Sequence, residues 1–181
     1  LGMQVTLCDP PLRKSTGDTK YKFLDDVIDA DILTLHVPLT KSGPCPTFHM
    51  IDANLLSRLS PRQFLINSAR GSVVDCPALS KVLSAGSLDG AVLDVWEGEP
   101  QIDYSLLDLV EIGSPHIAGY SLDGKVRGTE MIFEQLCRCF EMPVSWDTRD
   151  LYPAPAYLRP PAESRGQEAV RSVVVQAYDI L

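Results

Sequence analysis

The feature that most restricts the fold of this chain is the alternation of short apolar runs with helical patterns over its first 120 residues. The apolar runs have the length of strands, and turn-forming residues close them. They are continuous rather than alternating in polarity, which is typical of strands covered on both faces. Strand and helix in regular succession predict right-handed βαβ units, and therefore an α/β fold with a parallel sheet.

The expected elements follow one another closely. Strands are predicted at residues 3–8, 30–36, 63–67, 88–95 and 110–112. Helices are predicted at residues 23–29, 52–59, 75–85 and 104–109, and Asp52 is the expected N-cap of the second. The pattern changes after Tyr120, with a long amphipathic helix at 122–140, a Pro-rich linker or arm at 151–161 and a further helix at 168–181.

Composition and charge exclude some classes of partner. With 45% hydrophobic and 22% charged residues, the chain has the balance of an ordinary globular protein. Its net charge of −8 argues against nucleic acid or an anionic membrane as the main partner, because both need a basic face. No apolar stretch is long enough to span a bilayer. The five cysteines match no zinc or redox spacing and indicate reduced thiols in the cytoplasm, and the three histidines are too scattered to indicate a metal site.

Charged side chains and histidines gather where the expected strands end. Open parallel sheets bind their ligands at the carboxyl ends of their strands. These ends carry Asp9, His36-Val37-Pro38, the segment 67–71, the segment 94–100 and the segment 115–120. One edge of the sheet therefore collects two aspartates, an arginine, two glutamates and a histidine, a set that suits work on a small anionic substrate.

Three segments on this edge carry a family resemblance. INSARG (66–71), VLDVWEGEP (92–100) and SPHIAG (114–119) resemble the signature segments of the D-isomer-specific 2-hydroxyacid dehydrogenases, in the same order and at similar spacing. The resemblance covers residues 3–140. It implies a Rossmann-type doubly wound parallel sheet and an NAD-dependent enzyme that oxidises a 2-hydroxy acid.

Further features narrow the resemblance within the family. They are the segment Cys8 to Pro11, the DVWEGEP form of the glutamate loop, and Tyr120. Many relatives have Gly-Gly after His-Ile, where this chain has Ala118-Gly119-Tyr120. These features resemble members that act on a small phosphorylated 2-hydroxy acid and form homodimers. The arm Pro153 to Pro155 resembles the start of their extra dimerisation domain. We therefore expect a partial NAD-binding domain at 1–142, including the helix that returns to the substrate domain, and the start of a dimerisation domain at 143–181.

Other readings stay open at this point. The substrate could be another acid of the family, such as 3-phosphoglycerate or glyoxylate/hydroxypyruvate. Because fold does not determine function, an NAD-sensing scaffold that performs no catalysis is a second reading. A truncated, inactive gene product is a third.

The resemblance implies three catalytic residues. Arg70 would bind the substrate carboxylate, since a guanidinium fork matches a carboxylate bidentately and keeps its charge. His116 would take the proton that remains when an alcohol loses hydride, because neutral imidazole suits a pH near 7. A carboxylate beside this imidazole would fix its tautomer. Chemistry alone leaves Glu97 and Glu99 open as that carboxylate, and the family pattern favours Glu99, directly before the proline.

Asp9 is the expected contact to the adenosine ribose. An acid after the second strand of such folds binds the ribose hydroxyls and repels a 2′-phosphate, which predicts NAD rather than NADP. Arg13 and Lys14 nearby weaken that exclusion. The alternative is a turn-forming aspartate before Pro-Pro.

The remaining site assignments come from the resemblance. Asp94 would approach the nicotinamide amide, and Val37, Ala69 and Gly119 would add backbone or packing contacts to the cofactor, with an ordinary turn role as the alternative for these three. Tyr120 would donate its phenol to the substrate, or pack as an aromatic side chain. A structural role is expected for His36, His49 and Asp75, and Trp96 is expected to pack under the glutamate loop.

The phosphate-binding glycine loop G-x-G-x-x-G does not occur in the chain. Gly124 and Gly128 lie on a predicted helix at the wrong spacing. We expect the strand, loop and helix that carry this motif to precede residue 3 in a longer protein, with that strand between those at 3–8 and 30–36. Their absence would leave backbone groups unpaired and remove the pyrophosphate site. The 181 residues alone are therefore expected neither to fold stably nor to bind NAD well.

Overall fold

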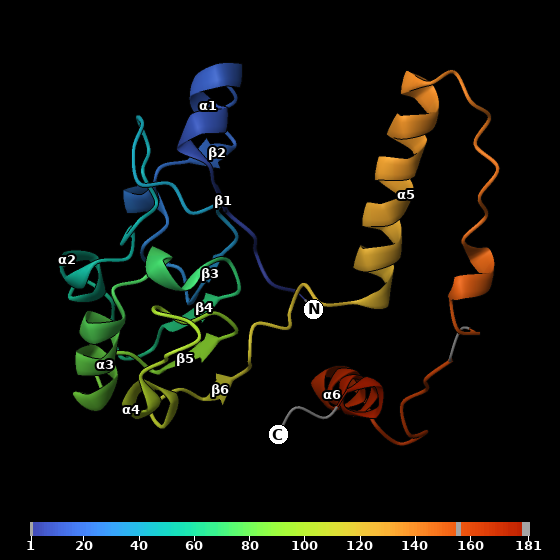
Figure 1. Cartoon of the computed structure of the whole chain (residues 1–181). Helices are drawn as coiled ribbons and strands as arrows, with labels where there is room; N and C mark the ends of the chain where they lie inside the picture. Colours follow the sequence, from blue (N-terminus) through green and yellow to red (C-terminus); the bar gives the residue numbers. More distant parts are fainter. Residues whose placement is uncertain (1, 155–156, 179–181) are drawn as a thin grey trace. The chain divides into compact units, whose positions relative to one another are not determined.

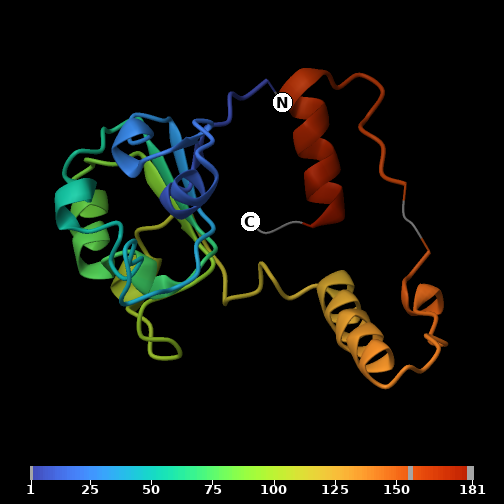
Figure 2. The ribbon, with the colours of Figure 1, turned by 90° about the horizontal axis from the view of Figure 1, so that it is seen from above.

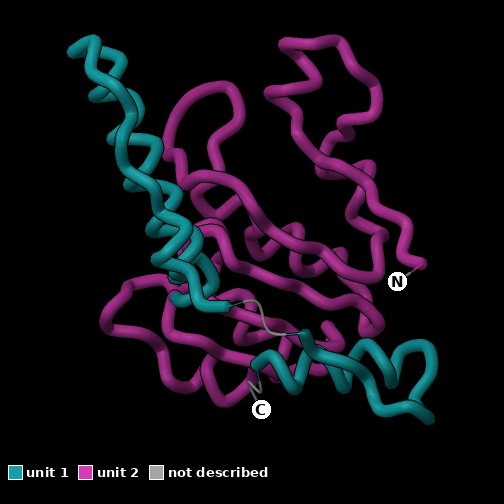
Figure 3. The backbone as a smooth tube through the Cα atoms, turned by 90° about the vertical axis from the view of Figure 1, so that its right-hand side faces the viewer, with its two compact units in different colours: residues 1, 117–181 teal, residues 2–116 magenta. Residues whose placement is uncertain are grey.

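The computed structural model describes residues 2–154 and 157–178, which form two compact units, residues 2–116 and residues from 117 onward (Figure 3). Pro155 of the predicted arm and residues 179–181 of the last predicted helix lie outside the described residues. No helix in the described part of the chain has both the length and the apolar character needed to cross a membrane.

A four-stranded parallel sheet forms the centre of the first unit (Figure 1). Its order follows the chain, with β3 (Ile32–Leu35), β4 (Phe64–Asn67), β5 (Gly90–Leu93) and β6 (Ile112–Gly113). The register aligns Leu33 with Leu65 and Leu65 with Ala91. The predicted α/β class and parallel sheet are confirmed. Each strand is shorter than predicted, because a strand extends only as far as a neighbouring strand forms backbone hydrogen bonds with it.

Three helices bury their apolar sides against this sheet. They are α2 (Ala53–Leu56), α3 (Cys76–Ser84) and α4 (Tyr104–Leu107), and Figure 1 and Figure 2 show α2 and α3 side by side. The core holds the fully buried side chains of Ile51, Leu56, Leu65, Leu79, Leu93 and Leu106. Each helix begins after an aspartate whose carboxylate accepts a backbone N–H of the first turn, and Asp52, at 2.8 Å from the Leu55 nitrogen, confirms the predicted N-cap.

One face of β3 departs from the prediction that the strands are covered on both sides. Leu33 and Leu35 are buried, whereas Ile32 and Thr34 are exposed. An apolar run in the sequence indicates that a strand can be buried on both faces, but it does not show which element of the chain supplies the cover.

A separate two-stranded sheet precedes the main one. β1 (Leu7–Cys8) pairs in parallel with β2 (Tyr21–Lys22), and α1 (Pro10–Thr16) connects them. Neither α1 nor β2 was predicted, because Pro10-Pro11 was interpreted only as the end of a strand. Proline is compatible with the first helical turn, whose N–H groups have no partner within the helix, so the helix begins there. β2 has two residues, too few to show a period.

The turns between strands contain short 3-10 segments. The predicted helix at 23–29 is a single 3-10 turn, η1 (Leu24–Asp26), and a second one, η2 (Gly71–Val73), follows β4. These segments are too short to show the apolar spacing of a helix, so their sequence does not distinguish a 3-10 turn from an α-helix.

The second unit contains α5 (Leu122–Cys139), η3 (Arg149–Leu151) and α6 (Gly166–Ala177). Ser121 caps α5, and Phe133 of this helix meets Trp146 edge to face at a centroid distance of 5.7 Å. The long predicted helix is confirmed almost to its ends. The division into units falls after His116, and the predicted domain boundary after residue 142 stays a prediction.

We predict that Leu79→Ala lowers the free energy of unfolding by about 2–5 kcal/mol, because Leu79 of α3 is fully buried and its truncation leaves a cavity. Urea denaturation of the full-length protein measures the change. Lys81→Ala, at an exposed position of the same helix, is the matched control and should stay within roughly 0.5 kcal/mol of the parent protein. Equal losses in the two variants would contradict the assignment of α3 to the core.

Candidate active site

The carboxyl ends of β3 and β4 border a cavity of about 530 Å³. Its lining residues are His36, Val37, Pro38, Leu39, Ser68, Ala69 and Arg70. The cavity brings together three of the predicted site residues from two different strand ends, as expected for an open parallel sheet.

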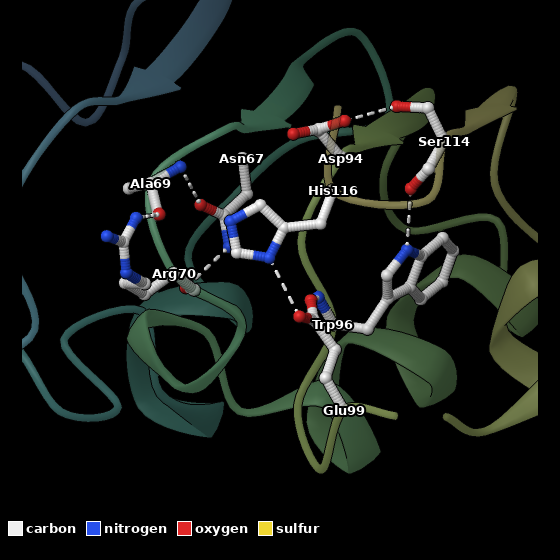
Figure 4. A network of polar contacts seen from close by, with 8 residues as sticks. All are labelled: Asn67, Ala69, Arg70, Asp94, Trp96, Glu99, Ser114 and His116. Atoms are coloured by element: carbon white, nitrogen blue, oxygen red, sulfur yellow. Dashed lines mark hydrogen bonds and ion pairs between the residues drawn. The ribbon is translucent and has the colours of Figure 1, made fainter. Parts of the chain in front are cut away.

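Arg70 reaches this cavity from a turn that the buried Asn67 side chain holds in place (Figure 4). The Asn67 amide donates to the Arg70 carbonyl at 3.1 Å, and its Oδ1 accepts from the Ala69 nitrogen at 3.1 Å. The Arg70 guanidinium donates to the Ala69 carbonyl at 2.6 Å. Within residues 2–154 and 157–178 Arg70 forms no ion pair, so the described chain gives no support to the reading of Arg70 as one half of a surface salt bridge.

His116 and Glu99 form a close pair. Nδ1 of His116 lies 2.8 Å from Oε2 of Glu99, and the other oxygen of Glu99 accepts from the Trp96 backbone nitrogen at 2.6 Å (Figure 4). The His116 backbone nitrogen donates to the Asp94 carbonyl at 2.7 Å. A carboxylate only accepts hydrogen bonds, so Nδ1 of the neutral ring carries the hydrogen and Nε2 keeps a lone pair that can take a proton.

The alternative between the two glutamates is decided by this geometry. Glu97 points to a different histidine, with its Oε1 2.6 Å from Nε2 of His49. Glu99 is therefore the carboxylate that the structure places against His116.

Asp94 and Trp96 anchor the loop that carries Glu99. Asp94 is buried at the end of β5 and accepts from the Ser114 hydroxyl at 2.7 Å. The Trp96 indole N–H donates to the Ser114 carbonyl at 2.9 Å, and its side chain is only 6% exposed. Trp96 thus packs under the glutamate loop as predicted.

Asp9 has a structural partner of its own. Its Oδ1 accepts from the Leu12 nitrogen at 2.8 Å and caps α1. A second cavity of about 410 Å³ lies beside α1, with Arg13, Lys14 and Cys45 among its lining residues. The turn-forming role that the sequence left open for Asp9 is present in the structure, and a ribose role stays a prediction.

Gly119 and Tyr120 belong to the second unit, and their expected roles beside the other site residues stay predictions. Tyr120 is 70% exposed, and the Lys125 ammonium lies 3.4 Å from the centre of its ring. A hydrogen bond with Lys125 lowers the pKa of the Tyr120 phenol.

The sequence analysis assigned structural roles to two histidines that lie close to the site residues. His36 lines the 530 Å³ cavity, with Nε2 2.9 Å from the Thr34 hydroxyl, and His49 pairs with Glu97 in the glutamate loop. The position of His36 at a strand end was the same signal that selected His116, and it could have found His36 as well. His49 follows no predicted strand, so only its tertiary contact with Glu97 shows that it lies near the site residues. The described residues contain no group of three or more histidine, cysteine, aspartate or glutamate side chains placed to hold a metal ion.

We predict that Gly71→Ala disturbs this site and costs about 2–3 kcal/mol of stability or more. A Cβ atom there would lie 2.0 Å from the backbone carbon and oxygen of Trp96, which cannot move aside as a flexible side chain can. Thermal unfolding measures the loss. Gly128→Ala, where a Cβ meets no atom within 4 Å and the helix favours alanine, is the control and should not lower stability.

Residues 1–118 match the family model described as D-isomer specific 2-hydroxyacid dehydrogenase, NAD binding domain. An erythronate-4-phosphate dehydrogenase of Photorhabdus laumondii is 43% identical over 99% of this chain and 48% of its own length, and one of Stutzerimonas stutzeri is 48% identical over 86% of this chain and 41% of its own length. The chain thus spans about half the length, or less, of these curated relatives.

Solved structures agree with the family match. The crystal structure of D-lactate dehydrogenase from Aquifex aeolicus, complexed with NAD and lactic acid, superimposes with a TM-score of 0.56 at 31% identity, over 67% of this chain and 40% of that one. This likeness supports the Rossmann-type architecture, and the matched family model is an NAD-binding domain. The match over residues 1–118, together with these relatives, shows that the chain belongs to the D-isomer-specific 2-hydroxyacid dehydrogenase family.

Proposed function

We propose that the protein containing this chain oxidises 4-phospho-D-erythronate to 2-oxo-3-hydroxy-4-phosphobutanoate with NAD, as a step in pyridoxal phosphate (vitamin B6) biosynthesis. The observation that carries the chemistry is the contact of 2.8 Å between His116 and Glu99 on the sheet edge that also holds Arg70. The choice of substrate is supported by the names of the relatives and by the features at Cys8 to Pro11 and at Tyr120.

His116 takes the proton of the reaction. Oxidation of the 2-hydroxyl removes a hydride from carbon and a proton from oxygen, and bound NAD supplies the hydride acceptor. The proton passes to Nε2 of His116, while Glu99 holds the Nδ1 hydrogen and stabilises the imidazolium that forms. Arg70 binds the carboxylate of the acid, and it also draws electron density from the oxygen at carbon 2 as the carbonyl develops.

Several residues of this chain fit a bound NAD. The lining of the cavity at the ends of β3 and β4 includes the small residues Val37 and Ala69. Buried Asp94 follows the neighbouring strand β5. Asp94 would meet the nicotinamide amide, Gly119 would add a backbone contact and Asp9 would hold the ribose.

The second unit supports further parts of the proposal. We assign Tyr120 to the substrate, with its phenol as donor. A homodimer fits the exposed large apolar side chains of α5, which are Leu122, Met131, Ile132 and Leu136. The acidic charge and the free cysteines fit a cytoplasmic enzyme without nucleic acid or membrane as partner.

The test is turnover by the full-length protein. NADH absorbance is followed at neutral to alkaline pH with 4-phospho-D-erythronate, 3-phosphoglycerate and glycerate. We expect turnover with the first acid alone, and a loss of roughly 10²–10⁴-fold in His116→Ala, the usual contribution of a general base. Lys81→Ala serves as the control variant.

The other outcomes separate the alternatives. Turnover with another acid would keep the family and the site but reject the substrate. Bound NAD without turnover of any acid would overturn the enzymatic proposal and favour the NAD-sensing scaffold.

We predict that Arg70→Lys raises the KM for the acid about 10–100-fold and changes the KM for NAD less than twofold. An ammonium is a point charge that cannot form the two parallel hydrogen bonds of a guanidinium fork to a carboxylate. Steady-state kinetics with each substrate varied measures both constants. Arg58→Lys, at an exposed arginine paired with Asp25, is the matched control, and an equal effect in both variants would refute the assignment.

A further inference from the structure

We propose that the hydrogen-bonded pair His49–Glu97 is a clamp that positions the two halves of the active site, the Arg70 turn and the His116–Glu99 pair, relative to each other. Both residues are positioning residues, because neither lines the cavity that Arg70 borders. This inference rests on the proposed function, since it deepens the account of the same site.

The pair is close and partly shielded from water. Oε1 of Glu97 lies 2.6 Å from Nε2 of His49, and the two side chains are 25% and 31% exposed. Oε2 of Glu97 accepts from the Cys76 backbone nitrogen at 3.4 Å, at the start of α3. Burial raises the pKa of the Cys76 thiol to about 11, so this neighbour stays uncharged near neutral pH. Fully exposed charge pairs contribute little to stability. The contact between His49 and Glu97 is stronger, because it is partly buried and Glu97 accepts a second hydrogen bond.

On one side, the clamp holds the turn that follows Arg70. The His49 nitrogen donates to the Ser72 carbonyl at 2.8 Å, and the Ile51 nitrogen donates to the Val73 carbonyl at 3.0 Å. Residues 49–51 therefore lie along η2, whose N-cap is Arg70. A change in the position of His49 is transmitted through these backbone bonds to the turn that aims the guanidinium.

On the other side, the clamp holds the glutamate loop. Glu97 lies two residues before Glu99, and the Trp96 nitrogen between β5 and Glu97 donates to the Glu99 carboxylate at 2.6 Å. A Cβ atom on Gly71 would lie 2.4 Å from the Glu97 nitrogen, which shows how closely η2 approaches this loop. The contact between His49 and Glu97 thus joins two backbone segments that already lie against each other at Gly71.

The backbone conformation gives independent support. Among the described residues, only three non-glycine residues have a positive φ, and they include His49 at +47° and His116 at +57°. Such conformations persist where the surrounding contacts determine them, and they concentrate at functional sites. Both histidines with this conformation contact glutamates of the same loop.

The test uses His49→Phe in the full-length protein, a change that keeps an aromatic ring beside Phe48 and removes the nitrogen that contacts Glu97. We expect kcat for the acid to fall about tenfold while the KM for NAD stays within twofold, because a misplacement of even 1 Å lowers the rate strongly. Glu97→Leu, which removes the carboxylate that contacts His49, should give a similar loss. Glutamine at position 49 can restore a hydrogen bond to Glu97, so His49→Gln should recover kcat to within about threefold of wild type.

The matched control is Asp25→Asn, which breaks the exposed Arg58–Asp25 ion pair of the same unit at 2.7 Å and touches no site residue. It should leave kcat unchanged. The double variant His49→Phe/Glu97→Leu should be no slower than either single variant, since both single changes remove the same interaction. Fully multiplied losses in the double variant would overturn the clamp, and circular dichroism verifies that each variant is folded.

A structural readout separates this inference from the proposed function. The distance between Nδ1 of His116 and Oε2 of Glu99 is measured in crystal structures of the wild type and of His49→Phe. This measurement does not depend on turnover. We expect this contact to lengthen beyond hydrogen-bond range in the variant. An unchanged distance together with unchanged kcat would refute the clamp. A wild-type protein that turns over no acid would refute the proposed function, and the distance would still decide the clamp.

Discussion

The parallel ladder of β3, β4, β5 and β6 is the constraint on which the other features of the first unit depend. Hydrogen bonding between strands of the same direction puts all their carboxyl ends at one edge, whatever the side chains there are. Core side chains such as Leu65 and Leu93, packed against α2, α3 and α4, hold the ladder together. The loops that leave this edge are therefore neighbours in space although they are far apart along the chain.

Buried polar groups convert this edge into a site with defined geometry. Asn67 binds the turn before Arg70, Asp94 binds Ser114, and the Trp96 indole binds the Ser114 carbonyl. Each of these groups is removed from water, so each would be costly without its partner, and each partner lies in a segment that carries a site residue. The exposed groups Arg70 and His116 are thus held by the buried ones behind them.

Local sequence rules predicted the first unit well wherever the physical cause acts between residues that are close together in the chain. Apolar runs predicted the four strands of the main sheet, and Asp52 predicted the start of α2, because burial and capping act at short range. The same rules missed α1, where two prolines were taken as the end of a strand and not also as the first turn of a helix, and β2, which exists only through its pairing with β1. The strands are also shorter than predicted, because hydrogen bonding to a neighbouring strand decides where each one begins and ends.

The sequence by itself determined the fold class, the strand ends that gather at one edge and the residue types available there, because period and turn chemistry are local properties. It also contained the family segments from which Arg70, Glu99 and His116 were predicted as catalytic residues. Only the tertiary structure decided which glutamate meets which histidine, since Glu97 and Glu99 differ by two residues and their partners are 48 and 17 residues away. The role of His49 likewise depends on a long-range contact that leaves no periodic signal in the chain.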